Sequence, residues 1–130
     1  MRLLLLAFIL SIMCMACQKK DTTPVQPSSI SIDLSNPKEG QIYHKGDSVF
    51  INAAVSYISQ LHGYELSVSK KADSSNVYYE YKHVYTDKFS INSYWIDTVT
   101  TTTDLKLTLT VQIDHDGNQR TVYVNLKTQP

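Results

Sequence analysis

The stretch DLKLTLTVQI, Asp104 to Ile113, gives the clearest indication of the fold. Apolar and polar side chains alternate through it with a period of two, which is the period of a β-strand with one buried face. The apolar phase is expected to face the core, and it consists of Leu105, Leu107, Leu109, Val111 and Ile113. The stretch therefore predicts a half-buried strand.

The same period recurs along the rest of the chain from Ser29 onward. Further strands are predicted at 29–34, 47–55, 62–69, 77–85, 89–99 and 121–126. In VYYEYKHVY the inward phase is expected to be Val77, Tyr79, Tyr81, His83 and Tyr85. Half-buried strands pack as two sheets. The pattern predicts an all-β fold, an immunoglobulin-like β-sandwich of about seven antiparallel strands, with a small open β-barrel as the alternative.

The chain begins with an apolar run that is too short to cross a bilayer. Leu3 to Met13 is almost wholly apolar, whereas a membrane-spanning helix needs about 20 residues. This length is typical of a signal peptide. The polar, Pro-, Ser- and Thr-rich segment that follows Cys17 has the composition of a flexible tether. The sequence predicts a signal peptide over 1–16, a lipidated cysteine and tether over 17–28, and a folded domain over 29–127.

Met15-Ala16-Cys17 resembles the lipobox of bacterial lipoproteins. The resemblance implies that the Cys17 thiol carries a diacylglycerol, that cleavage occurs just before it, and that a further acyl chain such as palmitate is added. Two or three chains anchor a protein stably to a membrane. Gln18 stands where an inner-membrane retention signal would have Asp. The resemblance thus implies an outer-membrane anchor, on either side of that membrane, and no cofactor apart from the covalent lipid.

The loops between the predicted strands resemble those of bacterial immunoglobulin-like domains. Residues 36–55 look like the opening of such a domain, with matches at Pro37, Gly40, Gly46 and Asp47. Residues 109–124 look like its last hairpin, with matches at Asp114, Gly117 and Asn118. The chain is similar to lipoproteins of unknown function that carry one such domain. Turn motifs of this kind support a fold and specify no activity.

The balance of charges argues against a nucleic-acid partner. The chain has 12 Lys and Arg against 12 Asp and Glu, and removal of residues 1–16 takes away only Arg2. No cluster of basic residues is present to neutralise phosphates. The expected contacts are the membrane, through the lipid anchor, and a protein or glycan partner.

The segment DHDGN, Asp114 to Asn118, has two interpretations. Carboxylates at alternate positions can converge on calcium, as they do in calcium-binding loops. An EF-hand also needs a glutamate at the twelfth position, where this chain has Asn125. A hairpin turn in which Gly117 supplies the positive φ explains the same residues and is the favoured interpretation.

The four histidines show no compact metal-ligand spacing. His83 is expected near the edge of the core, because it lies in phase with the tyrosines of its strand. No metal site is favoured, and the alternative function is a small metal-binding envelope protein. The candidate ligands for that alternative are His83, Asp114, His115 and Asp116.

Val77 to Trp95 is rich in tyrosine and holds the single tryptophan. Amphipathic aromatic side chains are enriched at binding surfaces. They also pair across strands for stability alone, and this reading is favoured. If the segment binds a partner, the candidate contact residues are Tyr78, Tyr94 and Trp95.

The predicted domain carries no motif of a catalytic site. It has no Gly-x-Ser-x-Gly nucleophile elbow and no phosphate-binding glycine loop, and it has no thiol beyond Cys17. We therefore expect no enzyme. The expected function is that of a membrane-anchored, non-catalytic binding or structural module.

Overall fold

The computed structural model describes residues 29–130. Cys17, the predicted signal peptide and the predicted tether lie outside this range. Within it, no helix is long and apolar enough to cross a membrane. The chain forms strands β1 (Ser31–Asn36), β2 (Gln41–His44), β3 (Ser48–Ser56), β4 (Gly63–Lys70), β5 (Asn76–His83), β6 (Lys88–Ile96), β7 (Thr103–Gln112) and β8 (Gln119–Gln129).

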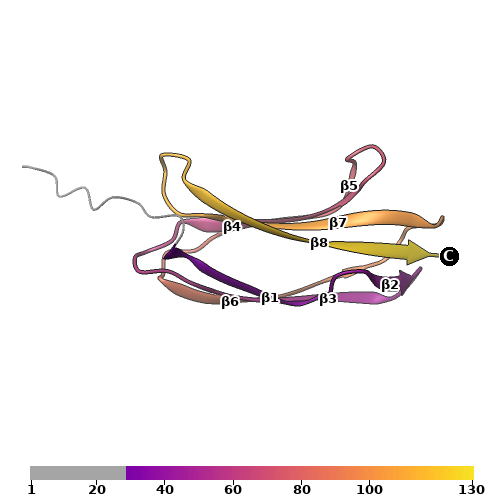
Figure 1. The fold of residues 1–130 in the computed structure, drawn as a ribbon, viewed down its shortest axis with the longest axis horizontal. Helices are drawn as coiled ribbons and strands as arrows, with labels where there is room; N and C mark the ends of the chain where they lie inside the picture. Colours follow the sequence, from indigo (N-terminus) through magenta and orange to yellow (C-terminus); the bar gives the residue numbers. More distant parts are fainter. Residues whose placement is uncertain (1–28) are drawn as a thin grey trace, which may run out of the picture.

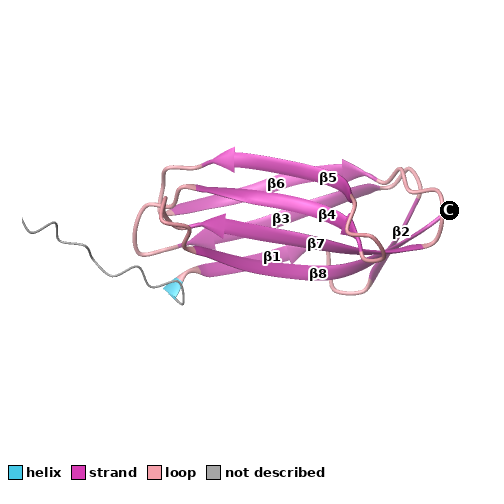
Figure 2. Ribbon diagram, turned by 90° about the horizontal axis from the view of Figure 1, so that it is seen from above, coloured by secondary structure: helices cyan, strands magenta, loops and turns pink. Residues whose placement is uncertain are grey.

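The strands form two sheets that pack face to face (Figures 1 and 2). One sheet has three strands in the order β1-β3-β6, and the other has five in the order β2-β8-β7-β4-β5. Each sheet keeps two edge strands, so the structure is a sandwich and the barrel alternative is wrong. The predicted immunoglobulin-like β-sandwich is confirmed.

Strand β2 departs from the prediction of about seven antiparallel strands. It is an additional strand of four residues, and it pairs in parallel with β8, whereas the other pairings are antiparallel. Its apolar residue Ile42 is 52% exposed. A four-residue edge strand with a single inward side chain, Tyr43, leaves no periodic signal in the sequence. Its pairing depends on contact with the distant C-terminus.

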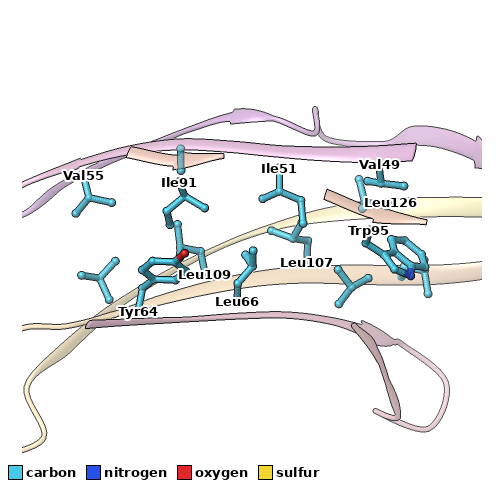
Figure 3. Close-up of a cluster of buried hydrophobic side chains, with 14 of the residues drawn as sticks. Val49, Ile51, Val55, Tyr64, Leu66, Ile91, Trp95, Leu107, Leu109 and Leu126 are labelled. Carbon is cyan, nitrogen blue, oxygen red and sulfur yellow. The ribbon is translucent and has the colours of Figure 1, made fainter. Parts of the chain in front are cut away.

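The core lies between the sheets and is built from the predicted apolar phases (Figure 3). Leu107 and Leu109 of β7 and Ile51 of β3 are completely buried, as their alternation predicts. Trp95 of β6 pairs with Val49 of β3 and packs near Leu126 at one end of the core. Burial of such side chains is the main source of stability for a domain of this size.

Val77 packs against the core as predicted, but from Tyr78 to His83 the phase of β5 is the reverse of the prediction. Tyr78 and Glu80 face inward and pair with Val68 and Leu66 of β4, whereas Lys82, in the same phase, is exposed. Tyr79, Tyr81 and His83 consequently lie on the outer face and are exposed. Tyrosines occupy both phases of this strand, so its pattern carries no contrast between apolar and polar faces. As an edge strand, β5 can place a carboxylate at the margin of the core.

Glu80 joins the two sheets at this margin. Its carboxylate accepts hydrogen bonds from the hydroxyls of Tyr64, Tyr78 and Ser93, each at 2.6 Å. Ser93 belongs to β6 of the other sheet, and the Tyr78 and Ser93 hydroxyls are 2.8 Å apart. The hydroxyls of Tyr64 and Tyr78, whose burial without a hydrogen bond would be unfavourable, thereby have an acceptor.

A second polar link is fully buried between the two sheets. Asp97 and Thr128 are 1% and 0% exposed, and the Thr128 hydroxyl donates to Asp97 Oδ2. The backbone N–H of Val99 donates to Asp97 Oδ1 at 2.9 Å. The pair connects the segment after β6 with the last strand, β8, and so ties the two sheets together.

The turns predicted from glycine form as expected. Gly40, Gly46 and Gly117 have φ angles of +74°, +94° and +88°, which favour glycine. Asp47 accepts a hydrogen bond from the N–H of His44 at 2.8 Å, so the predicted Gly-Asp pair closes the turn before β3.

Candidate binding surface

The outer face of β5 gathers aromatic side chains in one row. We call Tyr79, Tyr81, His83 and Tyr85 the β5 aromatic row. Tyr79, Tyr81 and Tyr85 are 54%, 40% and 60% exposed. The first three residues alternate along β5, so the β-strand period points their rings to the same side of the sheet. Tyr85 lies two residues beyond the end of the strand, and its ring stacks on that of His83.

Contacts within the row set the orientation of its rings. The rings of Tyr81 and His83 are 5.0 Å apart and nearly perpendicular, at 85°. Those of His83 and Tyr85 are 6.0 Å apart and nearly parallel, at 5°. The Tyr81 hydroxyl donates to Gln112 Oε1 at 3.1 Å, and this bond reaches over β4 to β7. Tyr81 is thus held at both its ring and its hydroxyl.

The sheet beside the row is polar. The outward positions of β4 from Glu65 to Ser69 and of β7 from Lys106 to Gln112 carry only Ser, Thr, Gln, Glu and Lys side chains. On the far side, the ring of Tyr123 in β8 lies 4.6 Å from Lys106 Nζ. The outer face therefore combines aromatic rings with hydroxyl, amide and charged groups.

Tyr79 keeps its proton at ordinary pH. Desolvation, and then the charge and hydrogen bond of the neighbouring Glu65 carboxylate, raise the pKa of its hydroxyl. A protonated phenol presents an apolar ring together with a hydrogen-bond donor. Such side chains suit a surface that is partly wet.

The contact residues predicted from the sequence do not come together. Trp95 is only 6% exposed and belongs to the core. Tyr78 points inward to Glu80, where the prediction had it outward. Tyr94 is 60% exposed, as expected, but it lies on the three-stranded sheet beside Phe50, with ring centroids 6.3 Å apart. The three candidates therefore lie on different faces of the sandwich, and Tyr78 was expected to face outward because the sequence assigned β5 the wrong phase.

His83 lies in this row and not at the core edge, which corrects the prediction. The two histidines that meet are His62 and His115, whose rings are 4.1 Å apart. His62 Nδ1 is buried and has no hydrogen-bond partner among residues 29–130. In the same range, no three His, Cys, Asp or Glu side chains are placed to hold one metal ion.

The DHDGN segment forms the β7–β8 turn. Asp114 Oδ1 accepts hydrogen bonds from the N–H groups of Asp116 and Asn118, and its Oδ2 accepts one from the Asn118 side chain at 2.7 Å. The bond from the Asn118 side chain contributes most to lowering the pKa of Asp114 below its ordinary value. The predicted candidates Asp114, His115 and Asp116 lie in this turn, and the Asp114 oxygens serve to hold it.

The Glu80 link contains ionisable groups with perturbed pKa values. Burial, followed by the hydrogen bond to Glu80, raises the pKa of Tyr64. Burial also raises the pKa of Glu80, but the three hydroxyl donors and Lys82 outweigh it and bring the pKa below its ordinary value. A carboxylate whose pKa is lowered and a phenol whose pKa is raised, both facing the core margin, are a structural pairing and not an acid–base pair poised near neutral pH.

Comparisons with known proteins add no functional assignment. No family model matches the chain, and no curated protein matches it. Solved structures with similar coordinates include the fibronectin(III)-like modules of Clostridium thermocellum CbhA, at 12% identity and a TM-score of 0.48, covering 76% of this chain and 96% of that one. Another is a chitin binding domain from Burkholderia pseudomallei, at 10% identity and a TM-score of 0.48, covering 69% of this chain and 57% of that one.

Proposed function

We propose that this protein is a lipoprotein of the cell envelope whose immunoglobulin-like sandwich is a non-catalytic binding or structural module. Its Cys17 carries the lipid, and the outer membrane is its location. The sandwich contacts a protein or glycan partner there. The metal-binding alternative gains no support, because the described residues bring no set of ligands together.

The observation that carries the binding role is the β5 aromatic row. Three tyrosines, Tyr79, Tyr81 and Tyr85, are each at least 40% exposed on one strand and its following loop. Core packing does not explain them, since the core contact of β5 is made by Tyr78 and Val77. Exposed aromatic clusters are a common feature of recognition surfaces.

The chain order supports an anchored module. Ser31, the first residue of β1, pairs with Ser56, the last residue of β3. The loops after β3 and β5 lie at this same end of the sandwich, where the N–H of Tyr57 donates to the carbonyl of Asp87 at 2.8 Å. Residue 29, where the description of the chain starts, thus lies at one end of the sandwich, and no strand of residues 29–130 covers either outer face (Figure 2).

Labelling with radioactive palmitate tests the anchor. The wild-type protein should incorporate label and enter the detergent phase of a detergent–water partition. Cys17→Ser should do neither, while the matched variant Cys14→Ser should behave as wild type, because Cys14 lies before the cleavage point. If Cys17→Ser remained fully membrane-bound, the apolar run itself would be the anchor and the lipoprotein proposal would fail.

A further inference from the structure

We propose that the β5 aromatic row and the polar face beside it form a binding site for an uncharged polysaccharide chain. This inference rests on the proposed function and deepens it, since it selects glycan over protein and names the face. The site consists of the rings of Tyr79, Tyr81 and Tyr85 with the hydrogen-bonding groups of Gln112 and Ser67.

The composition of the face is the first argument. A sugar ring has apolar C–H faces and a rim of hydroxyl groups, so it requires aromatic rings and hydrogen-bonding groups side by side. The centre of a protein–protein interface instead requires a dry, largely apolar patch. Between Glu65 and Ser69 of β4 and between Lys106 and Gln112 of β7, the outward side chains include no aliphatic residue. The aromatic rings of the row therefore lie directly beside a polar floor formed by these positions of β4 and β7.

The placement of the hydrogen-bonding groups is the second argument. Tyr81 donates its hydroxyl proton to Gln112 Oε1, which leaves both N–H bonds of the Gln112 amide for a ligand. Ser67 is the cross-strand partner of both Tyr79 and Thr108, so its side chain lies beside that of Tyr79 on the same face of the sheet. Each ring of the strand is thus accompanied by a group that can bond to a hydroxyl.

The shape of the row is the third argument. Alternate residues on a strand are about 6.7 Å apart, so Tyr79 to His83 spans about 13 Å. Tyr85 extends the row beyond the end of the strand. Strand β5 is the edge of its sheet, and no strand among residues 29–130 pairs with its free edge. An extended linear ligand can run along such a margin across several rings, which a compact ligand would not need.

Charge distinguishes a neutral chain from an acidic one. Over the same outward positions of β4 and β7 there is one acidic residue, Glu65, and one basic residue, Lys106. Lys106 lies over the ring of Tyr123 at the opposite side of the sheet from Tyr79. Sites for phosphate or carboxylate polymers cluster arginine and lysine. The row has no such cluster, and Glu65 beside it would repel a polyanion.

Affinity electrophoresis of the full chain, purified in detergent, tests the site. The gels contain a neutral soluble polysaccharide, hydroxyethyl cellulose, glucomannan or laminarin, and the chain is also mixed with insoluble cellulose and chitin. We expect wild type to be retained by at least one of these neutral probes. The double variant Tyr79→Ala/Tyr81→Ala should bind roughly tenfold more weakly or worse, since it removes two ring contacts.

Two controls separate the site from general effects. Tyr94→Ala removes an equally exposed tyrosine from the other sheet and should bind as wild type. Tyr81→Phe keeps the ring and removes the bond to Gln112, so it should weaken binding by less than Tyr81→Ala does. Retention by no neutral probe, or equal losses in Tyr94→Ala and the double variant, would overturn the inference.

An overlay of the protein on immobilised envelope material distinguishes this inference from the proposed function. Binding to a glycan should survive protease treatment of the material and be competed away by the neutral polysaccharide that retains the protein on the gel. Binding that is lost with protease and is not reduced by that polysaccharide would overturn the glycan site and leave a protein-binding module standing. If the protein bound neither untreated nor treated material, the glycan site and the binding role of the module would both fail, while the lipid anchor would still be decided by the palmitate experiment.

Discussion

Tyr79 and Tyr94 are exposed to a similar extent, 54% and 60%, on opposite outer faces of the sandwich. Tyr79 stands on the five-stranded sheet, where its cross-strand partner is Ser67. Tyr94 stands on the three-stranded sheet, where its partner is Phe50 and the exposed Ile96 follows two residues later. The same side chain thus belongs to a polar, ring-lined surface in one case and to a small apolar patch in the other.

The rest of the three-stranded face strengthens the contrast. Beyond Phe50, the amides of Asn36, Asn52 and Asn92 form a ladder across the sheet, with N···O distances of 3.1 and 3.0 Å. Past this ladder lies an open depression of about 420 Å³ with small side chains such as Ser31 and Ala54 on its floor. The exposed fraction of a tyrosine therefore says little about its role, and its cross-strand neighbours say more.

The largest expected effect on the free energy of unfolding comes from core substitutions, which test whether the two sheets share one core. Ile51→Ala beneath the three-stranded face and Leu107→Ala beneath the five-stranded face should each lower the free energy of unfolding by about 2–5 kcal/mol. Both side chains are fully buried between the sheets. Urea denaturation gives the values, with Lys106→Ala as the outward control, expected to cost at most about 1 kcal/mol. Equal losses at positions 106 and 107 would mean that the phase of β7 is wrong.

The next effect concerns the Glu80 link between the edges of the two faces. Glu80→Ala should cost roughly 1–3 kcal/mol, because the buried Tyr64 hydroxyl loses its acceptor. The pKa of Glu80 is below its ordinary value of 4.5 in the folded protein. Its contribution to stability is thus complete above that ordinary value and is lost as the pH falls through the folded pKa. Melting temperatures between about pH 3 and pH 6 should fall more steeply with acid for wild type than for Glu80→Gln.

Glu80→Gln serves as the control for shape, since the amide is nearly isosteric with the carboxylate. If both proteins showed the same dependence on pH, other groups would control acid unfolding. The link would then be a packing contact and not an electrostatic one.

The β7–β8 turn joins two neighbouring strands of the five-stranded sheet. Substitutions in it should change the free energy of unfolding by less than the changes above. Gly117→Val should lower stability by roughly 1 kcal/mol or more, because φ is +88° there and branched side chains rarely adopt that conformation. Gly117→Asn should cost less, since asparagine tolerates it. Millimolar calcium should leave the thermal melt of wild type unchanged. A rise of several degrees that Asp116→Asn abolished would show a calcium site in place of a simple turn.

The smallest effects should come from the two compared tyrosines. Tyr79→Ala and Tyr94→Ala should each change the free energy of unfolding by no more than about 0.5 kcal/mol, because neither ring is buried. Chemical denaturation measures both. A loss above about 1 kcal/mol at position 79 would indicate that the ring packs on its sheet, and the argument for a binding surface would weaken accordingly.

The candidate site could be anticipated only in part. The sequence indicated that the segment from Val77 to Trp95 is unusually rich in aromatic residues, and this segment does hold the β5 aromatic row. It did not indicate which rings face outward, because Tyr78 and Tyr79 offer the same side chain to both faces. Gln112 joins the site from a strand thirty-one residues away, and local patterns carry no information on such a contact.

The sequence by itself determined the architecture. Alternation in β3, β4 and β7 fixed which side chains are buried, because a strand with one apolar face must bury that face. The glycines fixed the turns, because only they adopt positive φ at no steric cost. The tertiary structure alone decided the phase of β5, the parallel pairing of β2 with β8, and the polar links made by Glu80 and Asp97. In each of these cases the deciding partner lies on another strand, and burial of a tyrosine, aspartate or glutamate is favourable only where such a partner supplies its hydrogen bond.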